Sequence, residues 1–166
     1  MQILPETDAA ELFDRLVAEQ VPDRRGLAAW RSMLRAHATL IRRLDTDLQQ
    51  ATGLALADFD VLAQLAEAHG ALRMTELADR ALISRSGMSR RVARLADEGL
   101  LRRDRAGTDG RGVVVALTEA GITRLAETAP VHARGISTLF VAQLDDQELA
   151  LLERALNKVI VDCSFG

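Results

Sequence analysis

The sequence predicts a mainly α-helical chain, in which a compact helix-turn-helix followed by a β-hairpin is flanked by longer helices at both ends. Three observations carry this prediction. With 3 Pro and 11 Gly in 166 residues and abundant Ala, Leu, Arg and Glu, the composition is typical of helices. Apolar residues recur at three-four spacing near both ends of the chain. Two short β-type runs surround the turn dipeptide Asp109-Gly110.

Composition also limits the class of protein. Apolar residues make up 48% of the chain, but aromatic residues only 3%, so Leu, Ala and Val must build the core. The single cysteine, Cys163, excludes an internal disulfide and a cysteine-based zinc site, and we expect its thiol to be incidental. The acidic start of the chain does not resemble a signal peptide, and no stretch approaches the ~18 apolar residues of a membrane span. We therefore expect a soluble, cytoplasmic protein.

The N-terminal part predicts two helices. Residues 8–20 carry Leu12, Leu16 and Val17 on one side and end at a breaker, Val21-Pro22-Asp23. A long helix follows over residues 27–51. Its apolar stripe has coiled-coil-like spacing and predicts another helix against it; the stripe consists of Leu27, Trp30, Leu34, His37, Ile41, Leu44 and Leu48.

The central part predicts short elements in quick succession. A helix over residues 57–69 aligns Phe59, Leu62 and Ala66 on one side. The following elements are a brief strand at 71–73, a helix at 75–81, a helix to residue 98 with Ser84 as its N-cap, and strands at 101–105 and 113–117.

The C-terminal part predicts two more helices. Thr118 caps the first, which Pro130 is expected to kink or interrupt. Asp145 and Glu148 have capping-box spacing and open the last, whose apolar stripe is Leu149, Leu152, Leu156 and Val159. Since neither end can bury its stripe alone, we expect a homodimer; the alternative is an intramolecular bundle. The expected domains are 1–52 and 118–166 for dimerisation and 53–117 for the helix-turn-helix and hairpin.

The helix that begins near Ser84 carries the candidate functional residues. At 100° per residue, Met88, Val92 and Leu95 point to the core, and the opposite side carries Ser86 and Arg90. Residues 84–111 contain eight arginines and four acids, which leaves 13 basic and 20 acidic residues elsewhere. A basic module on an acidic body favours binding of DNA phosphates. The alternative is a solvated arginine-rich helix.

We assign these residues to roles in a DNA major groove. Ser86, Ser89 and Arg90 are expected to read bases, and Arg85 and Arg94 to contact phosphates. Gly87 would allow the backbone to approach DNA. At the hairpin tip we expect Asp109, in the turn, and Arg111 to belong to the DNA-binding site, with Arg111 reaching a minor groove or phosphates.

Residues 56–121 resemble the MarR family of winged-helix regulators. The resemblance rests on the order and spacing of Met74-Thr75-Glu76-Leu77-Ala78, the run from Ile83 to Arg90, Leu95 with Gly99-Leu100, Asp109-Gly110-Arg111-Gly112 and Leu117-Thr118-Glu119-Ala120-Gly121. It implies a winged helix-turn-helix with dimerisation helices at both ends. It also implies a homodimer on palindromic operator DNA, usually a repressor released by a small, often phenolic, ligand.

A possible ligand site follows from the same resemblance. Trp30, Asp60 and Arg91 stand at places similar to the ligand site of the urate-responsive branch, although Ala93 stands where that branch usually has an acid. Trp30 and Arg91 suit an aromatic or anionic ligand, and His37 could line the cavity. The alternatives are a core or interface role for Trp30, a packed His37, and a structural ion pair between Asp60 and Arg91.

Other functions find little support in the sequence. There is no metalloprotease, hydrolase or phosphate-loop motif, the three histidines lack metal-ligand spacing, and no second cysteine supports redox chemistry. We therefore expect neither an enzyme nor a cofactor nor a metal. Two alternatives to a ligand-controlled repressor stay open: a DNA-binding regulator without a ligand, and a helical protein-interaction module that does not bind DNA.

Overall fold

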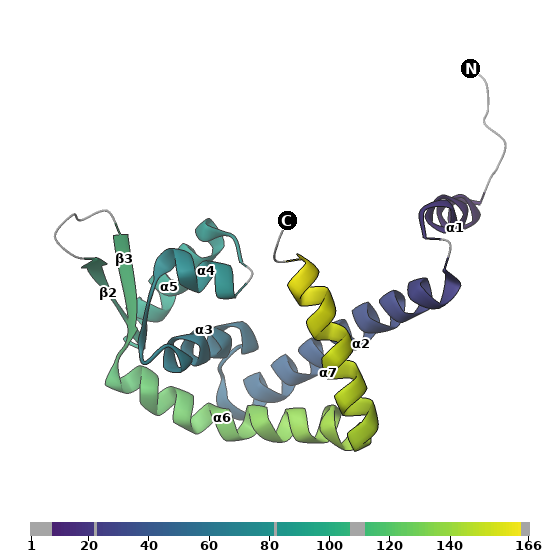
Figure 1. Cartoon of the computed structure of the whole chain (residues 1–166). Coiled ribbons are helices and arrows are strands. Elements are labelled where there is room, and N and C mark those ends of the chain that lie inside the picture. The colour runs from purple at the N-terminus through teal and green to yellow at the C-terminus, as the bar shows by residue number, and fades with distance from the viewer. Residues whose placement is uncertain (1–7, 22, 82, 107–111, 164–166) are drawn as a thin grey trace. The chain divides into compact units, whose positions relative to one another are not determined.

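The computed structural model describes residues 8–21, 23–81, 83–106 and 112–163, and the predicted turn at Asp109-Gly110 lies outside them (Figure 1). The chain divides into two compact units, residues 1–40 and residues 41–166. Helix α2, Arg24–Thr52, begins in the first unit and ends in the second.

The first unit contains α1, Ala9–Gln20, and the first part of α2. The Asp8 carboxylate accepts a hydrogen bond from the Ala10 amide at 3.0 Å and so caps α1. Helix α2 begins three residues before the predicted start at Leu27, because the Asp23 carboxylate accepts a hydrogen bond from the Arg25 amide at 2.9 Å. None of the described residues of this unit is buried.

The second unit contains a small sheet and the remaining helices. The strands are β1 Ala71–Arg73, β2 Leu101–Ala106 and β3 Gly112–Leu117. The helices are α3 Leu56–Glu67, α4 Met74–Arg80, α5 Arg85–Asp97, α6 Glu119–Leu139 and α7 Asp146–Cys163, with a 3-10 turn η1 at Val141–Gln143. Strand β3 lies between β1 and β2 and pairs with both in antiparallel register, so that Val115 faces Leu72 on one side and Arg103 on the other.

Two predicted helices differ from the observed ones. Helix α3 ends at Glu67, not at His69, because His69 adopts a left-handed φ of 59° and Gly70 a φ of 97°. Helix α6 is not interrupted at Pro130 but continues to Leu139. Beside the proline, the buried Thr128 hydroxyl donates to the Arg124 carbonyl at 2.8 Å, so its own polar group is satisfied within the helix.

The core of the second unit lies between α3, α4, α5 and the sheet. Its fully buried side chains include Leu62, Leu65, Leu77, Met88, Val92, Leu95 and Val115. The predicted core side of the arginine helix is thereby confirmed. At the start of α6 the backbone is so close to the sheet that a Cβ on Gly121 would lie 2.1 Å from the Leu100 carbonyl oxygen.

The fold is therefore mainly α-helical with a winged helix-turn-helix, as the sequence predicts. Helix α7 begins with the predicted capping box, since Asp145 accepts from the Glu148 amide at 2.8 Å and the Asp145 amide donates to Glu148 at 2.9 Å. Among the helices that the structure describes, none combines the length and hydropathy needed to cross a bilayer.

Candidate nucleic-acid interface

Helix α5 begins at a well-defined cap. The Ser84 hydroxyl accepts a hydrogen bond from the Gly87 amide at 3.2 Å, as predicted for an N-cap. A Cβ on Gly87 would lie 2.9 Å from the Ile83 side chain. Glycine at this position thus serves the packing of the turn between α4 and α5, in addition to any approach of DNA.

The outer face of α5 is polar and basic. Arg85, Ser86, Ser89 and Arg90 are exposed over its first two turns, whereas Met88 behind them is fully buried. The side chains of Arg85 and Arg90 make no hydrogen bond or ion pair within the described part of the chain. Their guanidinium groups are consequently available to an external anion.

Two further arginines of α5 are bound to α3. Asp58 is 5% exposed, and its Oδ1 accepts hydrogen bonds from Arg91 Nη1 at 2.6 Å and from Arg94 Nη2 at 2.5 Å. The ion pair considered between Arg91 and Asp60 is therefore wrong in its partner: the first turn of α3 presents Asp58 to α5. Arg94 also donates to Glu98 at 2.8 Å, and this bond and the one to Asp58 raise the pKa of the Arg94 guanidinium.

A hollow of about 410 Å³ opens beside these arginines. It is lined by Ile83, Gly87, Arg90, Arg91 and Arg94. The Nε atom of Arg91 is buried and has no hydrogen-bond partner within the described residues. The hollow therefore combines an apolar wall with guanidinium groups, a combination that suits a flat anion.

The wing follows α5 as strands β2 and β3. Arg102 and Arg103 of β2 are exposed, and Arg102 lies 3.4 Å from Asp104 in an ion pair. Asp109 and Arg111, which the sequence assigned to the wing tip, lie outside the described residues.

The candidate ligand residues are distributed over both units. Trp30 and His37 are exposed on the part of α2 that belongs to the first unit. Asp60 and Arg91 belong to the second unit, where the structure does not pair them. The charge of Asp60 instead influences the pKa of His132. The ring centroid of His132 lies 4.6 Å from that of Phe59. Burial lowers the pKa of His132, and the charge of Asp60 opposes this shift.

Sequence reasoning missed three residues that hold the interface in place. Asp58 was not singled out, although the three-residue spacing of Arg91 and Arg94 indicates a shared partner. Asp45 of α2 accepts a hydrogen bond from the Leu56 amide at 2.7 Å and so caps α3. Arg124 of α6 donates to the Thr52 carbonyl at the end of α2, and no motif in the sequence indicates this contact.

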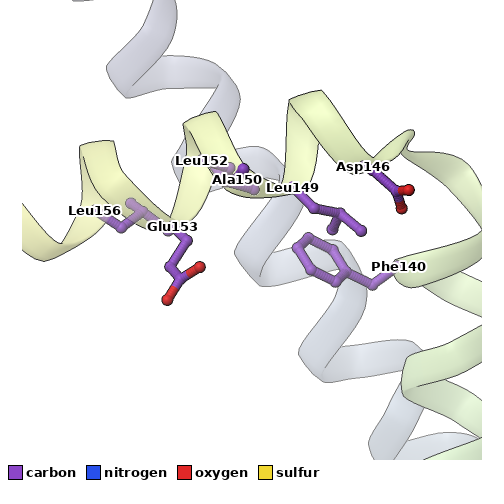
Figure 2. Close-up of a pocket in the computed structure, with 7 residues that line it drawn as sticks. All are labelled: Phe140, Asp146, Leu149, Ala150, Leu152, Glu153 and Leu156. Atoms are coloured by element: carbon purple, nitrogen blue, oxygen red, sulfur yellow. The ribbon is translucent and has the colours of Figure 1, made fainter.

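A second surface feature is apolar. Figure 2 shows Phe140 with its ring toward Leu149, while Leu152 and Leu156 lie farther along α7. These side chains line a groove of about 510 Å³ with Asp146, Ala150 and Glu153. Leu151, Val159 and Ile160 of the same helix are also largely exposed. In the first unit, the large exposed apolar side chains are Leu12, Phe13, Leu16, Val21, Trp30, Met33 and Leu34.

Metal ligation finds no geometric basis in the described residues. They contain no group of three or more His, Cys, Asp or Glu side chains that could hold an ion.

Comparison with known proteins gives a consistent picture. A family model described as MarR family matches residues 52–112. An uncharacterised HTH-type transcriptional regulator of Bacillus cereus is 31% identical over 106 residues, which span 64% of this chain and 69% of the relative. The structure is similar to that of AbsC, a MarR family transcriptional regulator from Streptomyces coelicolor, with a TM-score of 0.80 and 29% identity over 87% of this chain and 97% of that one.

A second solved structure is similar at higher identity. Sco3205, a MarR family transcriptional regulator from Streptomyces coelicolor, was solved in complex with DNA. Its TM-score is 0.77 and its identity 34%, over 83% of this chain and 90% of that one.

Proposed function

Because this chain belongs to the MarR family of transcriptional regulators, we propose that it binds operator DNA with helix α5 in the major groove and the wing beside it. One observation supports this proposal most directly. The first two turns of α5 expose polar and basic side chains, whereas the opposite side of the helix is buried; the exposed residues are Arg85, Ser86, Ser89 and Arg90. A relative that is 34% identical was solved in complex with DNA, which supports binding of DNA by this chain. As a member of this family the chain is a DNA-binding transcriptional regulator and not an enzyme.

We assign the roles by side-chain chemistry. Arg90 can give a bidentate pair of hydrogen bonds to guanine, and Ser86 and Ser89 can donate to or accept from base edges. Arg85 suits a phosphate at the start of the helix, and Arg111 extends the footprint through the wing. The sequence analysis also assigned Arg94 to a phosphate. Its ion pairs with Asp58 and Glu98 oppose this role.

A mobility shift with the DNA that flanks the gene tests this function. Arg90→Ala should lower the affinity for the operator by about 5- to 150-fold and relax discrimination against a scrambled duplex, since one base contact contributes about 1–3 kcal/mol. Arg134→Ala is the matched control, because Arg134 is an exposed arginine on α6, far along the chain from α5. Equal losses in both variants would contradict base reading by Arg90.

We further propose that the protein acts as a homodimer on a palindromic operator. The exposed apolar side chains of α1, α2 and α7, and the groove beside Phe140, support this proposal, since a second copy could cover them. Two copies related by a two-fold axis would place their α5 helices about 34 Å apart, in successive major grooves. In this arrangement residues 1–52 and 118–166 serve dimerisation and residues 53–117 bind DNA.

A small aromatic or anionic ligand could release a repressor of this design. The hollow lined by Ile83, Gly87, Arg90, Arg91 and Arg94 supports the proposal, because an anion bound there would occupy Arg90 and compete with DNA. Trp30, His37 and Asp60 would contribute only if the ligand reached them as well. Titrating the protein–operator complex with a panel of aromatic acids tests this: displacement by one of them, weakened in Arg91→Gln, is expected. Displacement by none would leave a regulator without a ligand.

A further inference from the structure

We propose that Asp58 is a positioning residue for DNA recognition, which holds Arg91 and Arg94 against α3 so that only Arg85 and Arg90 of α5 meet the DNA. The inference rests on the proposed binding of DNA by α5. It separates the four arginines of this helix into two that read or bind DNA and two that orient the helix.

The geometry of Asp58 is that of a clamp. Its carboxylate is almost completely buried in the first turn of α3, and a single oxygen accepts from Arg91 at 2.6 Å and from Arg94 at 2.5 Å. A buried carboxylate requires cationic or hydrogen-bonding partners, because desolvation penalises its charge. Asp58 has two such partners, Arg91 and Arg94, and both belong to α5.

Transfer of Arg94 to a DNA phosphate would require this clamp to open. Arg94 lies between two carboxylates, Asp58 and Glu98, so its charge is already compensated. Opening would leave Asp58 buried with Arg91 as its one remaining ion-pair partner among the described residues. Asp58 is buried although Arg94 is half-exposed, so opening would remove one of two cations from a buried carboxylate, whereas a phosphate contact at the surface is screened by salt. Arg94 therefore stays on Asp58 when DNA binds.

The clamp also fixes the rotation of α5 about its axis. Arg91 and Arg94 are three residues apart and lie on one side of the helix, so two bonds to one oxygen hold that side against α3. The anchor is fixed in turn, because Asp45 of α2 caps α3 through the Leu56 amide, two residues before Asp58. A rotation by one residue, ~100°, would move Ser86 and Arg90 away from the groove.

The salt dependence of operator binding distinguishes a clamp arginine from a phosphate contact. Each phosphate contact contributes about −0.9 to the slope of log affinity against log salt. We expect Arg85→Gln to make the slope shallower by about this amount per subunit, and Arg94→Gln to leave it unchanged. Because Arg94→Gln keeps the ion pair between Asp58 and Arg91, we expect this variant to fold. A change in its salt slope would then report a lost DNA contact and not a loss of folding. An Arg94→Gln slope as shallow as that of Arg85→Gln would overturn the inference.

Asp58→Asn tests the clamp from the other side. Releasing the arginines should make the slope steeper and lower the affinity ratio between operator and scrambled duplex by about tenfold, as for one misplaced base contact. The double variant Asp58→Asn/Arg94→Gln should then become shallower than Asp58→Asn, in contrast to the single Arg94→Gln. An Asp58→Asn protein with the wild-type slope and ratio would contradict the proposal. Failure of the wild type to bind any operator would instead overturn the proposed function, and this inference with it.

Discussion

Gly121, in the first turn of α6, lies against the backbone of Leu100, which directly precedes β2. Its amide donates to the Thr118 hydroxyl at 3.0 Å, and a Cβ would lie 2.1 Å from the Leu100 carbonyl oxygen. That oxygen belongs to the backbone and cannot rotate away. We predict that Gly121→Ala lowers the free energy of unfolding by about 1–3 kcal/mol, measured by urea denaturation.

A second glycine provides the control for this substitution. Gly26 lies in α2, and a Cβ there would find its nearest atom, in the Asp23 side chain, at 3.4 Å. Gly26→Ala should therefore not destabilise the protein, because alanine is the better helix former. Equal losses in the two variants would show that contact with Leu100 is not the cause.

His132 makes the stability depend on pH. His132 lies against Phe59, and burial there lowers its pKa. The histidine therefore binds a proton less readily in the folded chain than in the unfolded chain, where its pKa is about 6.5. The free energy of unfolding should fall as the pH decreases through about 6.5, and should level off below the folded pKa. Urea denaturation at a series of pH values measures this.

The matching variant removes the titrating group and keeps a flat ring. His132→Phe should have a weaker pH dependence in the same window, whereas His69→Asn, at an exposed histidine with φ of 59°, should keep that of the wild type. An unchanged pH dependence in His132→Phe would refute the assignment to His132.

At the scale of elements, the start of α5 depends on one hydroxyl. Ser84 accepts from the Gly87 amide and so satisfies one of the free donors of the first turn. Ser84→Ala should lower the free energy of unfolding by about 1 kcal/mol, measured by urea denaturation. Ser84→Asp keeps an acceptor at the same place and should lose much less; the same loss in both would mean that the cap contributes nothing.

The sequence predicted α5 well because its signals are local. The cap at Ser84 and the spacing of Met88, Val92 and Leu95 depend on positions within one helix, and the structure confirms both. The same holds for the capping box of Asp145 and Glu148. Local signals predicted the end of α3 wrongly. The first residue with a left-handed φ there is His69, not the following Gly70.

The partner of Arg91 was beyond such signals. Asp58 and Asp60 are both acidic residues in or near the first turn of α3 and differ by two positions, ~200° around the helix. Which of them meets α5 depends on how α3 is rotated in the core, and this rotation is set by Val61, Leu62 and Leu65 together with residues of α4 and the sheet. Tertiary packing of this kind is not encoded in the spacing of a single element.

At the scale of the whole molecule, the exposed apolar side chains of α7 carry the prediction of a dimer. Leu156 lines the groove beside Phe140, and Val159 is 55% exposed one turn later. Leu156→Asp would place a charge in a surface that a second copy covers in the proposed homodimer. We expect the variant to sediment as a monomer at concentrations at which the wild type is a dimer, measured by analytical ultracentrifugation.

An exposed valine outside the segments proposed for dimerisation serves as the control. Val113 of β3 is 41% exposed, and Val113→Asp should leave the sedimentation of the protein unchanged. A wild type that sediments as a monomer at all concentrations would contradict the homodimer directly.

The sheet has a mechanical consequence for the whole DNA-binding unit. Strand β3 leads out of the wing and pairs with β1 from Val114 to Ala116, and β1 continues directly into α4 at Met74. In the proposed complex, a contact between DNA and the wing is therefore connected to α4, the first helix of the helix-turn-helix, through the backbone hydrogen bonds between β3 and β1.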